Sequence, residues 1–168
     1  MKMASDSAVI GIIGDIDSQF EKAEEAYEKY RDIVDIWLQT GIVSEGLEYY
    51  KNKFFFSSNE APICKRIGPL KVFFLGGETI KIKKEKGIDI VLMKSSPDKK
   101  MVKLIKRLRP TVVFYSGAER TTKSKIDNTL LIGLEGINKS FILYTAFAST
   151  KAGRPQFDLE NRIRRVKL

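Results

Sequence analysis

The chain has 168 residues and a formal charge of +9, and it contains no histidine and a single cysteine. This length suits one domain with its own core, and 43% hydrophobic and 30% charged residues are typical of a globular protein. The lack of histidine excludes Ser-His-Asp and Cys-His catalysis. One cysteine excludes an internal disulfide and makes a zinc site improbable. Any catalysis must therefore use carboxylates, lysines, backbone amides or a cation that prefers oxygen ligands.

The positive charge predicts a polyanionic partner. A charge of +9 attracts polyanions, so RNA is the favoured partner, with solubility alone as the alternative explanation. A protein partner or a homo-oligomer also stays open. No apolar run reaches the roughly 20 residues of a membrane span, and no leader segment is evident. We therefore expect an intracellular protein, cytoplasmic or nuclear, with no membrane contact. It would form one domain over residues 1–168, with a basic C-terminal tail from about 151.

The first part of the chain predicts a strand that leads into a helix. Val9 to Gly14 is apolar and β-branched, which indicates a buried strand. Ser18 to Glu21 is a capping box, and apolar residues three and four apart behind it predict a helix to about Leu38. Residues 49–57 are aromatic and predict a further strand.

In the middle of the chain, Leu70 to Leu75 predicts a strand and Thr79 to Lys83 predicts a half-exposed one. Ile88 to Met93 is either a buried strand or the start of a helix, because its periodicity fits both. Ser96, Pro97 and Asp98 are typical of a helix start. This helix would end before Pro110.

The last part of the chain predicts a strand at Thr111 to Tyr115, a weaker helix over residues 125–134, and a final strand at Phe141 to Phe147. Helices that alternate with apolar strands predict an α/β fold in three α/β/α layers with a mainly parallel sheet, PIN-like or Rossmann-like. The carboxyl ends of the strands form the functional edge of such a fold.

Acidic residues at the ends of apolar segments are the candidate catalytic and metal-binding groups. Asp15 and Asp17 follow the first strand, and Asp89 lies among apolar residues after a basic, glycine-ended turn. Together with Glu119 they could bind Mg²⁺ or Mn²⁺, which take oxygen ligands. The alternative is that Asp17 caps a helix, that Asp89 pairs with a lysine, and that Glu119 is solvated.

Basic residues surround the apolar stripe of the predicted helix after Ser96, and more follow the strand that ends at Tyr115. They are candidates for contacts with successive phosphates, although a solvated helix face explains the same pattern. The loop from Ser116 to Lys123 could also bind an anion through its amides. The candidate nucleic-acid-binding residues are Lys99, Lys100, Lys103, Lys106, Arg107, Arg109, Arg120 and Lys123.

The order of these motifs resembles the NYN branch of the PIN-like ribonucleases. The matching segments, between Val9 and Arg120, are Asp15 to Ser18, Lys84 to Asp89, and Tyr115 to Gly117. The resemblance implies an α/β/α fold and an endoribonuclease dependent on a divalent metal, with Asp15 and Asp89 on two of the family's acidic positions and Glu119 assisting.

Two alternatives accompany this reading. Ser18, Ser95 and Ala118 stand where the family has an asparagine and two aspartates. The first alternative is therefore a catalytically silent module of this fold that binds RNA or a protein partner. The second is a small-molecule enzyme that uses the loop from Ser116 to Lys123 to hold an anion, and it ranks last because no general base is evident.

Overall fold

The computed structural model describes residues 7–16, 19–40, 55–56, 63–68, 70–75, 86–147 and 162–168. They form two sheets and two helices, α1 (Phe20–Tyr30) and α2 (Lys99–Leu108). Sheet A has the strand order β11-β10-β1-β2-β3, and sheet B has the order β4-β5-β6-β7-β9-β8.

Sheet A combines parallel and antiparallel pairs. β1 (Ser7–Ile13), β2 (Ile36–Gln39) and β3 (Phe55–Phe56) run parallel. β10 (Ser140–Phe147) is antiparallel to β1, and β11 (Ile163–Lys167) is antiparallel to β10. The chain reaches β2 from β1 through α1, which is the crossover that a parallel pair requires.

Sheet B is mostly parallel. Its four central strands run in one direction, and an antiparallel strand closes each edge. The strands are β4 (Ile63–Ile67), β5 (Leu70–Phe74), β6 (Ile90–Met93), β7 (Val112–Tyr115), β8 (Thr122–Ile126) and β9 (Thr129–Gly133).

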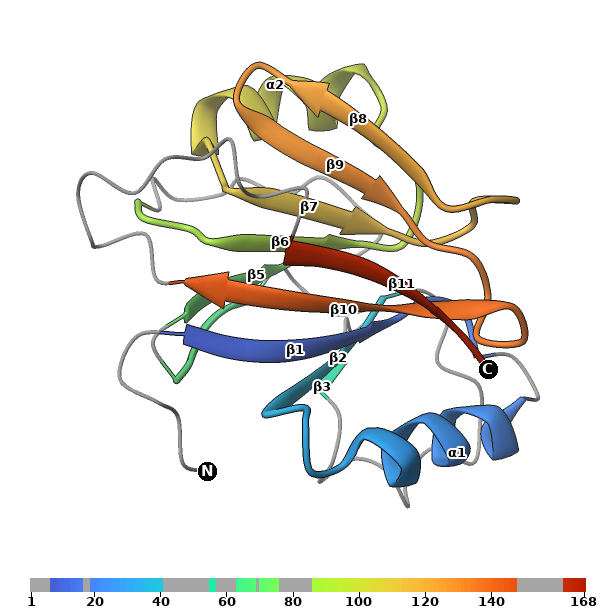
Figure 1. Ribbon diagram of the computed structural model, residues 1–168. Helices are drawn as coiled ribbons and strands as arrows, with labels where there is room; N and C mark the ends of the chain where they lie inside the picture. The colour runs from blue at the N-terminus through green and yellow to red at the C-terminus, as the bar shows by residue number, and fades with distance from the viewer. Residues whose placement is uncertain are drawn as a thin grey trace.

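The two sheets pack face to face, and one helix covers the outer face of each (Figure 1). Ile12 of β1 and Phe114 of β7 belong to the core between the sheets. The side chain of Val113, the residue before Phe114, belongs instead to the core under α2. Both faces of β7 are therefore buried, which explains its continuous apolar sequence.

This arrangement confirms the predicted α/β fold class, with helices on both outer sides and a mainly parallel sheet. The middle layer is a pair of packed sheets, which the sequence pattern did not reveal. Strands at β1, β5, β7 and β10 and a helix at α2 are confirmed. Ile88 to Met93 resolves as a strand, because β6 lies between two parallel neighbours.

Three predicted elements differ from the structure. The first helix ends at Tyr30, and Ile36–Gln39 forms β2, because these residues pair with β1. Residues 125–134 belong to the hairpin of β8 and β9 rather than to a helix. β10 is followed by β11, so it is not the last strand. Ser18, residues 79–83 and most of the segment 49–57 lie outside the described residues.

Candidate functional site

The carboxyl ends of the parallel strands of both sheets meet at one edge of the molecule. We call this edge the rim and define it by residues 14–16, 39–40, 94, 116–118 and 134–136. The backbone amide of Thr40 donates to the carbonyl of Ile13 (2.9 Å), and that of Ile137 donates to the carbonyl of Asp15 (2.9 Å). A side chain at Gly14 would place its Cβ 2.5 Å from the carbonyl oxygen of Glu135. The loops after β1 and β9 are therefore in close backbone contact.

Buried polar side chains join the two sheets at the rim. The hydroxyls of Thr40, after β2, and Ser116, after β7, form a hydrogen bond, and both residues are fully buried. Gln39 donates its amide nitrogen to the carbonyls of Gly14 (3.2 Å) and Thr40 (2.6 Å). These two acceptors fix the orientation of the amide. Its oxygen, Oε1, is buried and has no hydrogen-bond partner within the described residues.

Glu135 forms the charged link between the sheets. Its Oε1 accepts hydrogen bonds from Arg165 of β11 (2.7 Å), Thr121 (2.8 Å) and Ser140 (2.8 Å). The bond from Arg165 is the largest cause that lowers the pKa of Glu135 to about 2; burial opposes it, and the two hydroxyl donors add to it. Glu135 is therefore an ionised structural group, which its donors already occupy.

The sequence-predicted residues near the rim differ in exposure. Asp15 is half-buried after β1, while Glu119 and Arg120 are exposed in the loop after β7. Lys139 donates its Nζ to the backbone carbonyl of Glu119 at 3.3 Å. Lys123 is exposed on β8. Asp17 lies outside the described residues, so its predicted roles as ligand or cap stay predictions.

Asp89 lies at the opposite edge from Asp15. It precedes β6, and its carboxylate accepts the backbone amide of Lys71 (2.8 Å) at the start of β5. Its carbonyl accepts the backbone amides of Thr111 (3.1 Å) and Val112 (3.2 Å). The length of β6 separates this edge from the rim by about 13 Å. The structure therefore does not bring Asp15 and Asp89 to one cation, because Asp89 stands before its strand rather than after it.

Asp89 instead belongs to the core near its own edge. It is only 4% exposed, and its charge contributes to raising the pKa of Tyr144 in β10, for which burial is the larger cause. The nearby Arg162 has the opposite, smaller effect on that pKa. Asp89 thus acts as a buried acceptor that ties together the amino ends of β5, β6 and β7.

The basic residues of α2 all lie on its solvent-facing side. The buried residues Met101, Leu104, Ile105 and Leu108 face sheet B. Asp98 caps the helix by accepting the amide of Met101 (2.8 Å). The exposed basic residues are Lys99, Lys100, Lys103, Lys106 and Arg107, with Arg109 just beyond the helix. α2 covers the outer face of sheet B, whereas the rim lies at the strand ends (Figure 1).

The donors at the rim suit a hard cation better than zinc. The carboxylate of Asp15 and the amide oxygen of Gln39 are oxygen groups, which Mg²⁺ and Mn²⁺ prefer, whereas the hydroxyls of Thr40 and Ser116 already bond each other. No group of three acidic, histidine or cysteine side chains that could hold a metal occurs in the described part of the chain. A cation held by a single carboxylate and completed by water or ligand phosphate is common for Mg²⁺.

Lys94 adds a positive charge to the rim. It directly follows β6 and is half-buried, and burial lowers the pKa of its ammonium group. A lysine in such a position can attract an anion as a point charge.

Solved structures show what this fold resembles. An archaeal phosphodiesterase aligns with a TM-score of 0.59 at 15% identity, over 95% of this chain and 99% of its own. A predicted phosphoesterase from Streptococcus pneumoniae aligns with a TM-score of 0.54 at 11% identity, over 99% and 100%. Vps29 from Entamoeba histolytica, in a complex with Zn²⁺, aligns with a TM-score of 0.51 at 11% identity, over 95% and 98%. No protein-family model and no curated protein sequence matches the chain.

These likenesses correct the functional prediction from sequence. The matching structures are phosphoesterase-like, so the resemblance to NYN/PIN-like ribonucleases is wrong, and so is the predicted RNA-acting endoribonuclease. The alternative of a silent module that binds RNA or a protein partner has no support either. The fold agrees with this correction: Asp89, the last residue of the motif, lies at the amino end of β6, not at the edge where Asp15 lies.

Sequence reasoning also missed most of the rim. Gln39 and Thr40 were assigned to the end of a helix, and Glu135 was not singled out. Two signals were available in the sequence. Gln39 and Thr40 form a polar pair directly after the apolar run Ile36 to Leu38, and Glu135 is an acid at the end of an apolar run, just before a glycine. No helix in the described residues is long and apolar enough to span a membrane. Over these residues, the chain has the fold of the phosphoesterase and phosphodiesterase structures that it matches.

Proposed function

We propose that the protein binds phosphate esters at the rim and hydrolyses them with the help of one Mg²⁺ or Mn²⁺ ion. The likeness in fold to a phosphodiesterase and a phosphoesterase supports the substrate class. The observation that carries the proposal is the buried Oε1 of Gln39, which has no hydrogen-bond partner in the described part of the chain and whose amide contacts Gly14, the residue before Asp15. A buried oxygen without a donor calls for a water or an ion beside it.

Each rim residue has a role in this proposal. Asp15, which is half-buried after β1, would hold the cation. Lys94 would attract the phosphate, because a half-buried ammonium group acts more strongly than one in bulk water. Thr40 and Ser116 would keep the two sheets in register beneath the ligand through their hydrogen bond. When bound, the cation would neutralise phosphate charge and lower the pKa of a coordinated water.

The oxygen donors favour Mg²⁺ or Mn²⁺ over Zn²⁺, although Zn²⁺ is present in the Vps29 structure with a related fold. Because the described rim offers one carboxylate outside the Glu135 network, we expect the cation to bind weakly and to need excess metal in solution. Hydrolysis should therefore be slow at low cation concentration and should rise as Mn²⁺ is added.

Hydrolysis of p-nitrophenyl phosphate, a monoester, and bis-p-nitrophenyl phosphate, a diester, tests the proposal. We expect activity with Mn²⁺ or Mg²⁺ that a chelator removes, and that Asp15→Asn reduces at least about 100-fold. Glu24→Gln is the matched control, since Glu24 is exposed on α1 and is not one of the rim residues. The proposal is overturned if the Asp15→Asn protein is as active as the parent. It is also overturned if neither ester is hydrolysed with Mg²⁺, Mn²⁺ or Zn²⁺.

A further inference from the structure

A cavity of about 380 Å³ lies between the end of α2 and the turn that joins β8 to β9. Its size is at the lower end of the range of small-molecule sites. Ile105, Pro110 and Ile126 give it apolar walls, and Lys106, Arg109 and Asp127 supply charges. Because Pro110 and Thr129 flank the start of the parallel strands β7 and β9, this cavity lies at the opposite edge from the rim.

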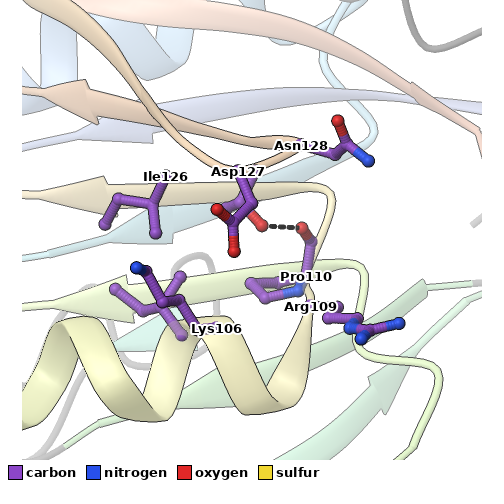
Figure 2. Close-up of a pocket in the computed structure, with 8 residues that line it drawn as sticks. Lys106, Arg109, Pro110, Ile126, Asp127 and Asn128 are labelled. Carbon is purple, nitrogen blue, oxygen red and sulfur yellow. Dashed lines mark hydrogen bonds between the residues drawn. The ribbon is translucent and has the colours of Figure 1, made fainter.

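Three charged residues line this cavity. Lys106, Arg109 and Asp127 are exposed, and the side chains of these three make no ion pair or hydrogen bond with any described residue. Figure 2 shows Asp127 above Pro110, with Lys106 on one side and Arg109 on the other. The hydrogen bond from the Thr129 hydroxyl to the carbonyl of Pro110 (2.6 Å) holds the hairpin turn against the end of the helix.

Arg109 occupies a position that usually belongs to glycine. It ends α2 in the left-handed conformation, with φ of 49°, and its amide donates to the carbonyl of Ile105. Glycine is the favoured residue there because a Cβ is strained in this conformation. Arg109 therefore combines a strained backbone with a place among the residues that line the cavity, which points to a functional use of its side chain.

We propose that this cavity binds a small ligand with two carboxylates and one ammonium group, of the acidic amino acid type. Arg109 and Lys106 each face one carboxylate, since the guanidinium and ammonium groups are donors suited to carboxylate oxygens. Asp127 and the carbonyls at the end of α2 face the ammonium group, because the carboxyl end of a helix favours positive charge. The cavity has two positive groups and one negative group, which is the complement of this ligand.

The test uses ¹⁵N-labelled full-length protein titrated with L-glutamate and followed by two-dimensional NMR. We expect the amide signals of residues 105–109 and 126–129 to shift. Two compounds remove one charged group each: glutarate lacks the ammonium group, and 4-aminobutyrate lacks one carboxylate. Each should bind roughly tenfold more weakly or worse, since a hydrogen bond to a charged group is lost. None of the three contains phosphate, so the outcome is independent of the rim.

Three variants complete the test without disturbing the fold. Arg109→Gly, Lys106→Gln and Asp127→Asn each remove one charge, and glycine and asparagine both tolerate the left-handed backbone at their positions. Each should weaken glutamate binding roughly tenfold, whereas Lys103→Gln, on the exposed side of α2 and outside the cavity, should not. The proposal fails if glutamate shifts none of these signals, if glutarate binds equally well, or if Asp127→Asn binds like the parent.

Discussion

The hydroxyls of Thr40 and Ser116 form one buried hydrogen bond that joins sheet A to sheet B. These residues stand 76 positions apart in the chain, at the ends of β2 and β7. With the amide of Gln39 and the carboxylate of Glu135, this bond forms a buried polar layer beneath the rim. The position of the rim loops therefore depends on how the two sheets are aligned.

The hydrogen bond between the sheets should be measurable by a double-mutant cycle. Thr40→Val keeps the shape of the side chain but leaves the hydroxyl of Ser116 buried without that partner, so we expect a loss of about 1–3 kcal/mol in unfolding free energy. Ser116→Ala should cost a similar amount. The double variant should lose less than the sum of the two, because no unpaired hydroxyl remains. Urea unfolding of the four proteins gives the coupling, and strict additivity would show that the two hydroxyls do not interact.

The ion pair of Glu135 and Arg165 should make stability depend on pH in the acid range. Folding lowers the pKa of Glu135 from 4.5 to about 2. The ionised carboxylate therefore contributes fully to the free energy of unfolding above pH 4.5. This contribution is lost as the pH falls from there towards 2. The shift corresponds to stabilisation of the order of 3 kcal/mol.

Glu135→Gln removes this titration and serves as the comparison. The variant should be less stable than the parent at pH 7, and its stability should fall less steeply between pH 4.5 and 2. Unfolding free energies from urea titrations at several pH values measure both effects. Parallel pH profiles for the two proteins would assign the acid sensitivity to other carboxylates.

Replacement of Arg109 by glycine should stabilise the protein. The left-handed conformation at this residue, with φ of 49°, costs a residue with a side chain about 1–2 kcal/mol. Glycine loses more entropy on folding, so a net gain of about 0.5–1 kcal/mol is expected. Thermal unfolding measures the gain, with Lys103→Gly in the middle of α2 as the opposite case, which should be destabilised. A decrease in stability for Arg109→Gly would mean that the guanidinium stabilises the fold itself.

Gly11 should tolerate no side chain, because it lies against Trp37 in the neighbouring strand. A Cβ at this position would lie 2.4 Å from Cε3 of the indole ring. Gly11→Ala should therefore displace the ring and destabilise the protein by about 1–3 kcal/mol.

Tryptophan fluorescence reports this displacement directly, because Trp37 is the single tryptophan of the chain. Gly117→Ala provides a control: with φ of 86° it strains the backbone, but nothing lies within 4 Å of its added Cβ. It should lower stability without a change in the emission of Trp37. An unchanged emission spectrum in Gly11→Ala would contradict the close contact.

Local pattern predicted the strands and helices where burial and periodicity agree. The strands β1, β5, β7 and β10 are mainly apolar because both of their faces are largely covered. The helix at α2 followed from its apolar stripe and from the helix-start residues before it, although its cap is Asp98 rather than Ser96. The stretch Ile36 to Gln39 was misassigned, because its apolar residues also fit the spacing of the helix before it. Its pairing with β1 makes it a strand.

The sequence by itself determined the α/β class, the buried strands and the absence of histidine chemistry, because these depend on composition and on short-range periodicity. Only the tertiary structure decided that two sheets pack together, that Thr40, Ser116 and Glu135 meet at the rim, and that Asp89 lies at the far edge from Asp15. The physical reason is strand direction, because a residue before a strand and a residue after it lie at opposite edges of a sheet. Only the pairing of distant segments fixes which edge of one sheet meets which edge of the other.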